Sequence, residues 1–169
     1  MTFKRVQYGN VYQKKYVDWL ERADLLHHGF VARQNEAVSW TPVAKALADS
    51  RVALLTTAGV HPKAVKPFDD VALEGDPTFR VIPADIPSED LMVTHNHYEH
   101  SDADKDINCL FPIDRLREVA SEGLVGDLSD EFFGFMGFNP QPDRIVENAE
   151  EIASNLTAAN VDVVLLTPG

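Results

Sequence analysis

Apolar residues along this chain follow two kinds of spacing, which alternate. Short unbroken apolar runs occur at 51–57 (RVALLTT), 91–94 (LMVT) and 162–167 (DVVLLT). An unbroken run of this length is typical of a strand that is covered on both faces of a parallel sheet. Apolar residues recur every three or four positions at 11–28 and again after Pro142, which indicates helices. Strands that alternate with helices predict an α/β fold with a mainly parallel sheet flanked by helices, in a Rossmann-like three-layer arrangement.

Prolines and glycines refine these boundaries. Pro112 stands where a helix can begin, and Gly123 supplies a stop for that helix. Five prolines in 60–89 forbid a long helix there, although 78–82 is suited to a short strand. The segment 132–138 (FFGFMGF) is apolar with two glycines, so it fits either a strand or a tightly packed segment.

The chain divides into two predicted parts. Residues 1–50 form an N-terminal helical arm, with a short helix expected at 43–48, and residues 51–169 form the α/β domain. A parallel α/β domain normally continues from a strand into a covering helix, so we expect the domain to be incomplete at its C-terminal end. The alternative is that 162–167 is an edge strand at a natural terminus.

Composition and charge narrow the classes of function. The chain has 169 residues, with 15 Lys and Arg against 27 Asp and Glu, a formal net charge of −12. This balance argues against nucleic acid and anionic membranes as partners. Cys109 is the single cysteine and lies among apolar residues, so we expect a buried packing residue and no intrachain disulfide. No signal peptide and no apolar run near the roughly 20 residues of a membrane span are seen, which favours a cytoplasmic protein.

Polar side chains follow each of the three apolar runs. They are Thr56, Thr57, Gly59 and His61 after the first, His95, His97 and Tyr98 after the second, and Thr167 at the third. If the strands are parallel neighbours, their carboxyl ends meet at one crevice. Hydroxyls and loop N–H groups there could hold a carboxylate, and imidazoles could move protons. The alternative is that threonine and glycine simply end the strands.

The segment 95–102 (HNHYEHSD) resembles the HxHxDH metal motif of metallo-β-lactamase-type hydrolases, with Glu99 in the Asp position. Such a motif could bind zinc and activate water. That family needs further ligands downstream, and no histidine follows His100. We therefore expect no metal, and keep a metal-dependent hydrolase as an alternative function. A mononuclear site formed by His61, His95 and His97 also stays open.

Several stretches, in order, give the chain a more specific resemblance. They are 51–61 (RVALLTTAGVH), 75–83 (GDPTFRVIP), 93–98 (VTHNHY), 111–117 (FPIDRLR), 122–126 (EGLVG), 135–137 (FMG) and 162–167 (DVVLLT). Together they resemble the selenoprotein B family of glycine, sarcosine and betaine reductases and D-proline reductase. The resemblance covers about residues 40–169. It implies an oxidoreductase subunit that cleaves a small amino-acid or amine carboxylate reductively.

In the resembled family, the strand equivalent to 162–167 is followed by a selenocysteine or cysteine. The resemblance thus implies selenocysteine directly after Gly169, and a chain that ends at its UGA codon would be inactive. It implies no cofactor in this chain, a pyruvoyl group on a partner subunit, other reductase subunits, a dithiol donor and a homo- or hetero-oligomer. It places His97 or His61 as proton donor, and the threonine and glycine backbone as support for the carboxylate or selenolate. A non-catalytic binding module remains a further alternative.

Overall fold

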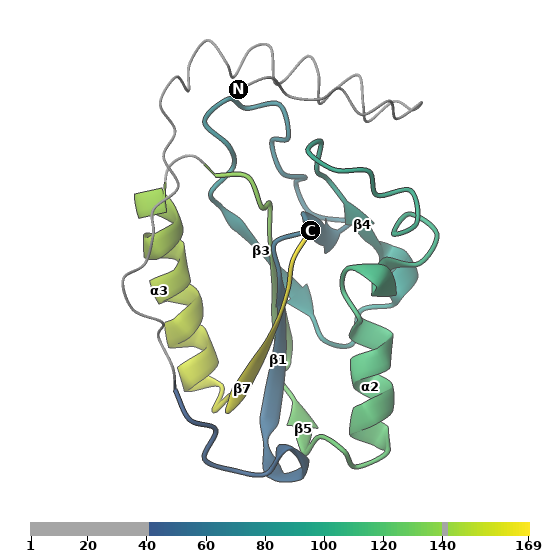
Figure 1. The fold of residues 1–169 in the computed structure, drawn as a ribbon, viewed down its shortest axis with the longest axis vertical. Helices are drawn as coiled ribbons and strands as arrows, with labels where there is room; N and C mark the ends of the chain where they lie inside the picture. The colour runs from purple at the N-terminus through teal and green to yellow at the C-terminus, as the bar shows by residue number, and fades with distance from the viewer. Residues whose placement is uncertain (1–40, 140–141) are drawn as a thin grey trace, which may run out of the picture.

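The computed structural model describes residues 41–139 and 142–169. The helix predicted at 11–28 lies outside the described residues. A mixed five-stranded sheet forms the centre of the molecule, and two helices flank it. Helix α2 (Ile113–Ser121) lies on one side of the sheet and helix α3 (Pro142–Ala158) lies on the other (Figure 1). No helix in the described ranges is long and apolar enough to cross a membrane.

Strand β1 (Arg51–Thr56) is the centre of the sheet. Strand β7 (Val163–Thr167) pairs with it in parallel along one side. On its other side, β5 (Asp127–Leu128) and β6 (Glu131–Phe135) pair in parallel with its first and second halves. Strand β3 (Phe79–Pro83) adds antiparallel to β6. The predicted α/β fold with a mainly parallel sheet is confirmed, whereas the Rossmann-like detail is not, since β3 runs against the other strands.

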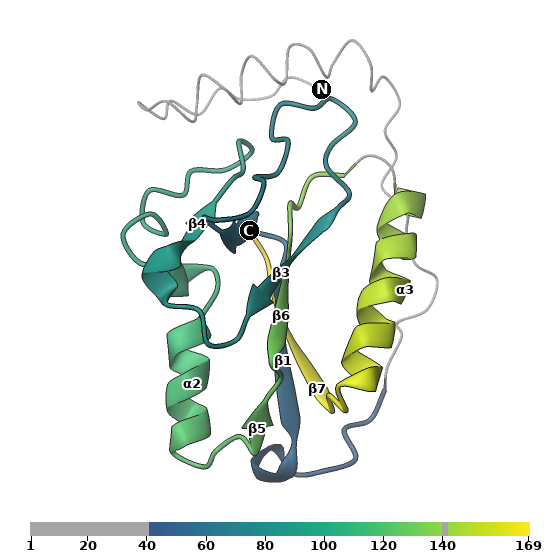
Figure 2. The same cartoon turned by 180° about the vertical axis from the view of Figure 1, so that it is seen from behind.

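Strands β2 (Val60–Pro62) and β4 (Leu91–Val93) form a separate two-stranded antiparallel sheet (Figure 2). The run 91–94 is therefore a strand, as predicted, but it is not a parallel neighbour of β1. Each strand of this small sheet has only three residues, and Met92 faces partly outward. Residues 94–98, which follow β4, therefore reach the end of β1 as a loop. They do not extend a strand of the central sheet.

Three short 3-10 turns complete the described elements, at η1 (Leu47–Asp49), η2 (Ser88–Asp90) and η3 (Ile107–Cys109). The helix predicted at 43–48 is wrong, because the structure has a single 3-10 turn at Leu47–Asp49 in its place. The predicted burial of Cys109 is also wrong. In η3 the buried side chain is Ile107, and the cysteine is exposed at the other end of the turn.

The helices predicted after Pro112 and after Pro142 are both present. Pro112 caps the start of α2, and Gly123, at φ +72°, follows its end in the left-handed backbone region. Helix α3 begins at Pro142. Two groups of apolar side chains pack on the sheet, one on each face. On the α2 face they include Leu54, Phe111, Ile113, Leu116 and Phe132, and on the α3 face they are Phe133, Phe135 and Ile152.

The last strand departs from its prediction in one respect. Its apolar sequence predicts cover on both faces, but Leu165 is 41% exposed and Leu166 is 66% exposed. In the described part of the chain, β7 pairs with β1 alone and forms an edge of the sheet. Neither α2 nor α3 covers the side chains of Leu165 and Leu166.

We predict that Phe132→Ala lowers the free energy of unfolding by roughly 3–5 kcal/mol, because it removes a buried ring and leaves a cavity. Phe132 is fully buried, and its ring meets that of Phe111 edge-on at 6.2 Å between centroids. Urea unfolding followed by far-UV circular dichroism measures the change. As a control, Leu124→Ala at a site 59% exposed should shift stability by about 0.5 kcal/mol or less. A loss below about 1 kcal/mol at Phe132 would contradict this packing.

Candidate functional site

The carboxyl ends of β1 and β7 are held together by hydrogen bonds to one carbonyl. Thr57 N and Thr56 Oγ1 both donate to Thr167 O, each at 3.1 Å. Thr56 Oγ1 also accepts from Ala58 N at 3.1 Å. The Thr167 hydroxyl is buried and makes no hydrogen bond to a described residue. The structure therefore brings together three of the predicted site residues, Thr56, Thr57 and Thr167.

Gly59 lets the histidine segment approach this point. Its φ of +76° lies in the left-handed region, and a Cβ on it would collide with the Thr94 carbonyl. Its N–H donates to Phe135 O at 2.7 Å, and its carbonyl accepts from Thr94 N at 2.9 Å. Tyr98 then fastens the far end of the segment, since its hydroxyl donates to Ala58 O at 2.6 Å. The segment 94–98 is thus tied to the chain just after β1.

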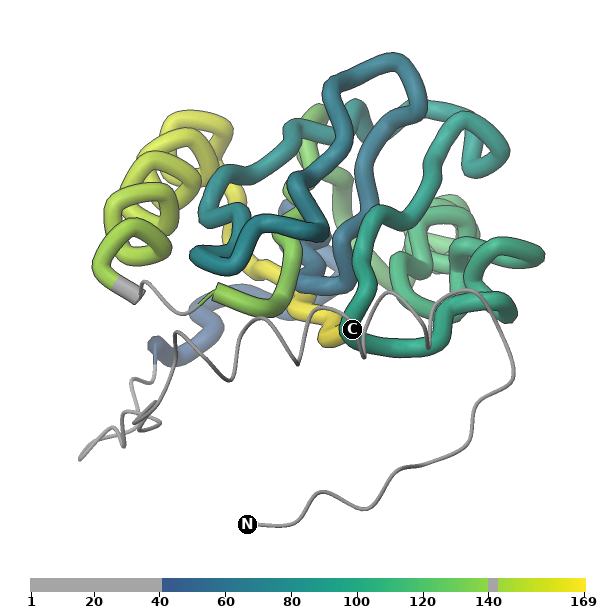
Figure 3. Tube along the Cα trace, turned by 90° about the horizontal axis from the view of Figure 1, so that it is seen from above, coloured from purple at the N-terminus to yellow at the C-terminus, as the bar shows by residue number. Residues whose placement is uncertain are grey.

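The rings of His95, His97 and Tyr98 form a cluster beside these strand ends. The His95 ring lies 5.1 Å from that of His97 and 4.7 Å from that of Tyr98, between centroids. His97 stacks on Phe138 at 4.6 Å, with the rings almost parallel at 11°. Any side chain at Gly169 would meet Ala58 and the Tyr98 ring. The segment after β7 therefore lies against Tyr98 of this cluster. Figure 3 shows the backbone at this end of the chain from above.

Burial keeps the imidazoles of the cluster uncharged. It lowers the pKa of His95 to about 3, with the charges of His97 and His100 adding to the effect. Burial alone lowers the pKa of His97 to about 4. Burial also raises the pKa of Tyr98, so its hydroxyl stays protonated. At neutral pH His97 can accept a proton or donate a neutral N–H hydrogen bond, and it can act as a proton donor only if a bound ligand raises its pKa.

His61 is placed apart from the cluster. It lies on β2 and is fully buried, with its ring edge-on to Phe68. Nδ1 lies 2.8 Å from Pro62 O and Nε2 lies 2.8 Å from Thr94 Oγ1. Because a carbonyl only accepts, Nδ1 carries the hydrogen and Nε2 accepts from Thr94. Both nitrogens are engaged, so this geometry gives His61 a positioning contact with the residue that precedes His95.

The sequence marks some neighbours of the cluster as candidate site residues and not others. His100 Nδ1 lies 3.0 Å from the Asp104 carboxylate, and Asn96 Nδ2 donates to Asp70 O. Phe138, the stacking partner of His97, stands at the end of an apolar run that sequence analysis assigns either to a strand or to a tightly packed segment. His100 and Asn96 share one segment with His95 and His97, so the sequence marks them. Phe138 lies 41 positions after His97, and nothing local marks it.

The histidine segment does not form a ligand set for a metal. Among the described residues, no three His, Cys, Asp or Glu side chains are grouped so that they could hold a metal ion. His100 turns to Asp104, and His97 turns its face to Phe138. The geometry of residues 95–102 therefore gives no support to the hydrolase alternative.

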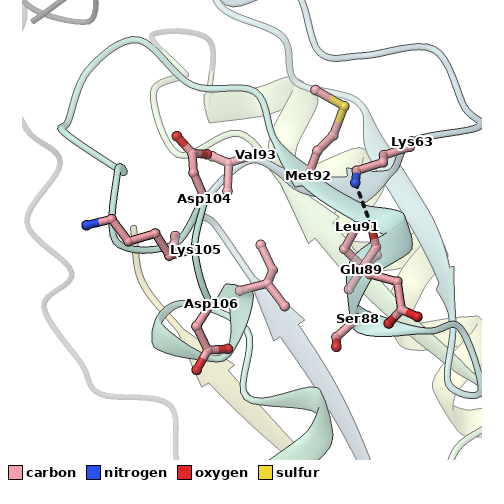
Figure 4. Close-up of a pocket in the computed structure, with 11 residues that line it drawn as sticks. Lys63, Ser88, Glu89, Leu91, Met92, Val93, Asp104, Lys105 and Asp106 are labelled. Atoms are coloured by element: carbon pink, nitrogen blue, oxygen red, sulfur yellow. Dashed lines mark hydrogen bonds between the residues drawn. The ribbon is translucent and has the colours of Figure 1, made fainter.

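A separate hollow of about 400 Å³ lies beside β4 and residues 103–107 (Figure 4). Lys63 Nζ donates to Glu89 O at its rim, at 2.5 Å. Lys105 points away from the hollow and pairs with Asp102 at 2.8 Å. Both lysines that line it therefore already have partners, so the hollow is poorly suited to an anionic ligand.

Comparison with known proteins now identifies the family. Residues 26–169 match the family described as glycine/sarcosine/betaine reductase selenoprotein B. The chain belongs to this family. It is 49% identical over 131 residues to the D-proline reductase subunit gamma of Acetoanaerobium sticklandii, a match that covers 77% of this chain and 53% of that subunit. The resemblance stated from the sequence is thereby confirmed.

More distant relatives belong to glycine and betaine reductase complexes. The chain is 27% identical over 135 residues to the glycine reductase complex component B subunit gamma of Carboxydothermus hydrogenoformans, covering 75% of this chain and 29% of that subunit. It is 30% identical over 73 residues to the betaine reductase complex component B subunit beta of Peptoclostridium acidaminophilum, covering 43% and 17%. The chain thus spans about half of the D-proline reductase subunit and less than a third of these two. No solved structure matches it significantly.

We predict that the buried imidazoles of this selenoprotein B family member resist protonation. The folded state lowers the pKa of His95 from 6.5 to about 3, so the unfolded chain binds its proton first as the pH falls. The stability that this difference contributes is complete above pH 6.5 and is lost as the pH falls from 6.5 towards 3. NMR titration of the imidazole carbons should give midpoints near 3 for His95 and near 4 for His97.

A matched pair of variants separates this effect from general acid unfolding. His95→Gln should weaken the pH dependence of stability between 6.5 and about 5, where the carboxylates are still largely ionised. Thr157→Ala, on the exposed face of α3, should leave that dependence unchanged. A His95 midpoint close to 6.5 would show that the ring is not buried as the structure has it.

Proposed function

We propose that this chain is part of a reductase component that cleaves a small amino-acid carboxylate reductively, with D-proline as the preferred substrate. The 49% identity to a D-proline reductase subunit, against 27% to a glycine reductase subunit, supports that preference. The observation that carries the proposal is the meeting of the β1 and β7 ends through Thr167 O, two residues before Gly169, where an added side chain would meet the ring of Tyr98.

The order of the strands supports a binding place at this point. From β1 the chain leads through α2 to β5 and β6 on one side, and α3 then returns it to β7 on the other side. In open α/β sheets a ligand binds beyond the carboxyl ends of the strands where the order reverses in this way. Here that place lies between β1 and β7, where Thr56, Thr57 and Thr167 meet.

The side chains at this place suit a carboxylate and a proton transfer. The buried Thr167 hydroxyl is a donor without a partner among the described residues, and a carboxylate oxygen is an acceptor. Neutral His97 can take up a proton or, once a ligand raises its pKa, give one to the leaving amine. In the proposed reaction a dithiol supplies two electrons and two protons. The C–N bond at the α carbon breaks, carbon and nitrogen each gain hydrogen, and the dithiol becomes a disulfide.

The redox residue is the part of this proposal that rests on the family. We propose that a selenocysteine or cysteine follows Thr167-Pro168-Gly169 in the full-length protein, and a selenolate supplies a strong nucleophile at neutral pH. The backbone at Gly169 lies against Ala58 and Tyr98, so a residue placed next would stand beside the imidazole cluster. A pyruvoyl group on a partner subunit would supply the activation of the substrate.

The relatives named as complex components support partner subunits for this chain. We propose that it works in a cytoplasmic homo- or hetero-oligomer with other reductase subunits and a dithiol donor. We also propose that the 169 residues have no turnover without the redox residue. The nucleotides after the Gly169 codon test this part directly, since an in-frame UGA or Cys codon followed by a coding region supports it and any other stop codon contradicts it.

We predict that the full-length protein with its partner subunits reduces D-proline with a dithiol, and that His97→Gln lowers kcat by about 10²–10⁴-fold. D-proline consumption in the presence of dithiothreitol measures the effect, with glycine, betaine and sarcosine as comparison substrates. Leu124→Ala, which is exposed and distant in the fold from the cluster, should retain full turnover. Unchanged turnover in a folded His97→Gln protein would remove this histidine from the mechanism.

A further inference from the structure

The outer side of β7 is apolar and uncovered, although this strand lies next to the centre of the sheet. Each residue of β7 pairs with β1 from Val163 to Thr167, and in the described ranges no other strand pairs with it. In Figure 1, β7 lies in front of β1 with its outer edge towards the reader. A strand edge with free N–H and C=O groups is a ready template for another strand.

The exposed leucines of β7 lie on opposite faces of the sheet. Leu165 is in register with Leu54, whose side chain packs on the α2 face, and Leu166 is in register with Leu55, which packs on the α3 face. Leu166 is the more exposed of the two, at 66% against 41%. Among the described residues, β7 therefore has an unpaired edge, and it lacks cover on both faces at Leu165 and Leu166, most of all at Leu166 on the α3 face.

The far edge of the sheet is different. Strand β3 there runs antiparallel, ends in Pro83 and carries Arg80, whose guanidinium lies 4.3 Å from the ring centre of Phe68. Proline and charged side chains are the usual means of closing an edge strand to pairing. The sheet is consequently closed on the β3 side and open on the β7 side.

We propose that the edge of β7 and its Leu166 face dock a strand and a helix from the portion of the D-proline reductase gamma subunit that this chain does not match. That portion is nearly half of the subunit, since the match covers 53% of it. A strand in parallel with β7, reached by a right-handed connection, places its helix on the α3 face, where Leu166 is bare. The inference rests on family membership and not on the proposed reaction.

A chimeric protein tests the inference. The matched residues of the Acetoanaerobium sticklandii subunit are replaced by residues 1–169 of this chain, and hydrogen exchange is followed by mass spectrometry in the chimera and in the 169-residue chain. We expect the β7 amides to exchange at least about tenfold more slowly in the chimera, because paired edge amides are protected from exchange. The amides of β3 should exchange at the same rate in both proteins. Equal exchange of β7 in the two proteins would overturn the proposal.

Paired variants give an independent readout. Leu166→Lys should lower the Tm of the chimera by several degrees and leave that of the 169-residue chain unchanged, because only the chimera covers this side chain. Leu124→Lys, at a site of similar exposure, should change neither Tm. If the β7 amides of the 169-residue chain become protected as its own concentration rises, a second copy is the occupant and the proposal is wrong. None of these measurements uses enzymatic activity, so they fail or succeed separately from the reductase function.

Discussion

The site depends on one carbonyl group, that of Thr167. It accepts hydrogen bonds from Thr57 N and from Thr56 Oγ1, and these bonds fix the end of β7 against the end of β1. Without these bonds, β1 and β7 could still pair from Val52 and Val163 onwards, but the position of Thr167 relative to Thr56 would not be fixed. The Tyr98 hydroxyl donates to Ala58 O, one residue after Thr57. This bond holds the histidine segment next to the ends of β1 and β7.

Crowding, more than any ionic partner, sets the chemistry of the cluster. His95, His97 and Tyr98 pack ring against ring, and this burial disfavours each charged form. The result is a neutral region on a protein whose net charge is −12. The three side chains contribute hydroxyl and imidazole groups to this region and no carboxylate.

Local pattern predicts most of the elements and the mainly parallel sheet, but not the directions of β2, β3 and β4. The run 51–57, the proline at 142 and the glycine at 123 each mark a real strand or helix boundary. Whether a strand runs parallel depends on the length and route of the connection, so neither the antiparallel β3 nor the separate β2–β4 sheet could be read from spacing.

The candidate site shows the same division. Residues that share a segment, such as His95, His97 and Tyr98, are close in space because they are close in sequence. Thr56 and Thr167 were brought together by an assumption about parallel strands that proved correct for β1 and β7. His61 was grouped with them by its place after β1, but the turn at Gly59 carries it into β2, where its ring contacts Thr94.

The pairing of β1 with β7 joins positions that are 111 residues apart in the sequence. During synthesis, β1 leaves the ribosome long before β7 has been made. Contacts between residues so far apart in the sequence form slowly. The junction of β1 and β7 at Thr167 O is absent until β7 has been synthesised. The polar groups at the ends of these two strands therefore take up their relative positions only after translation has passed residue 167.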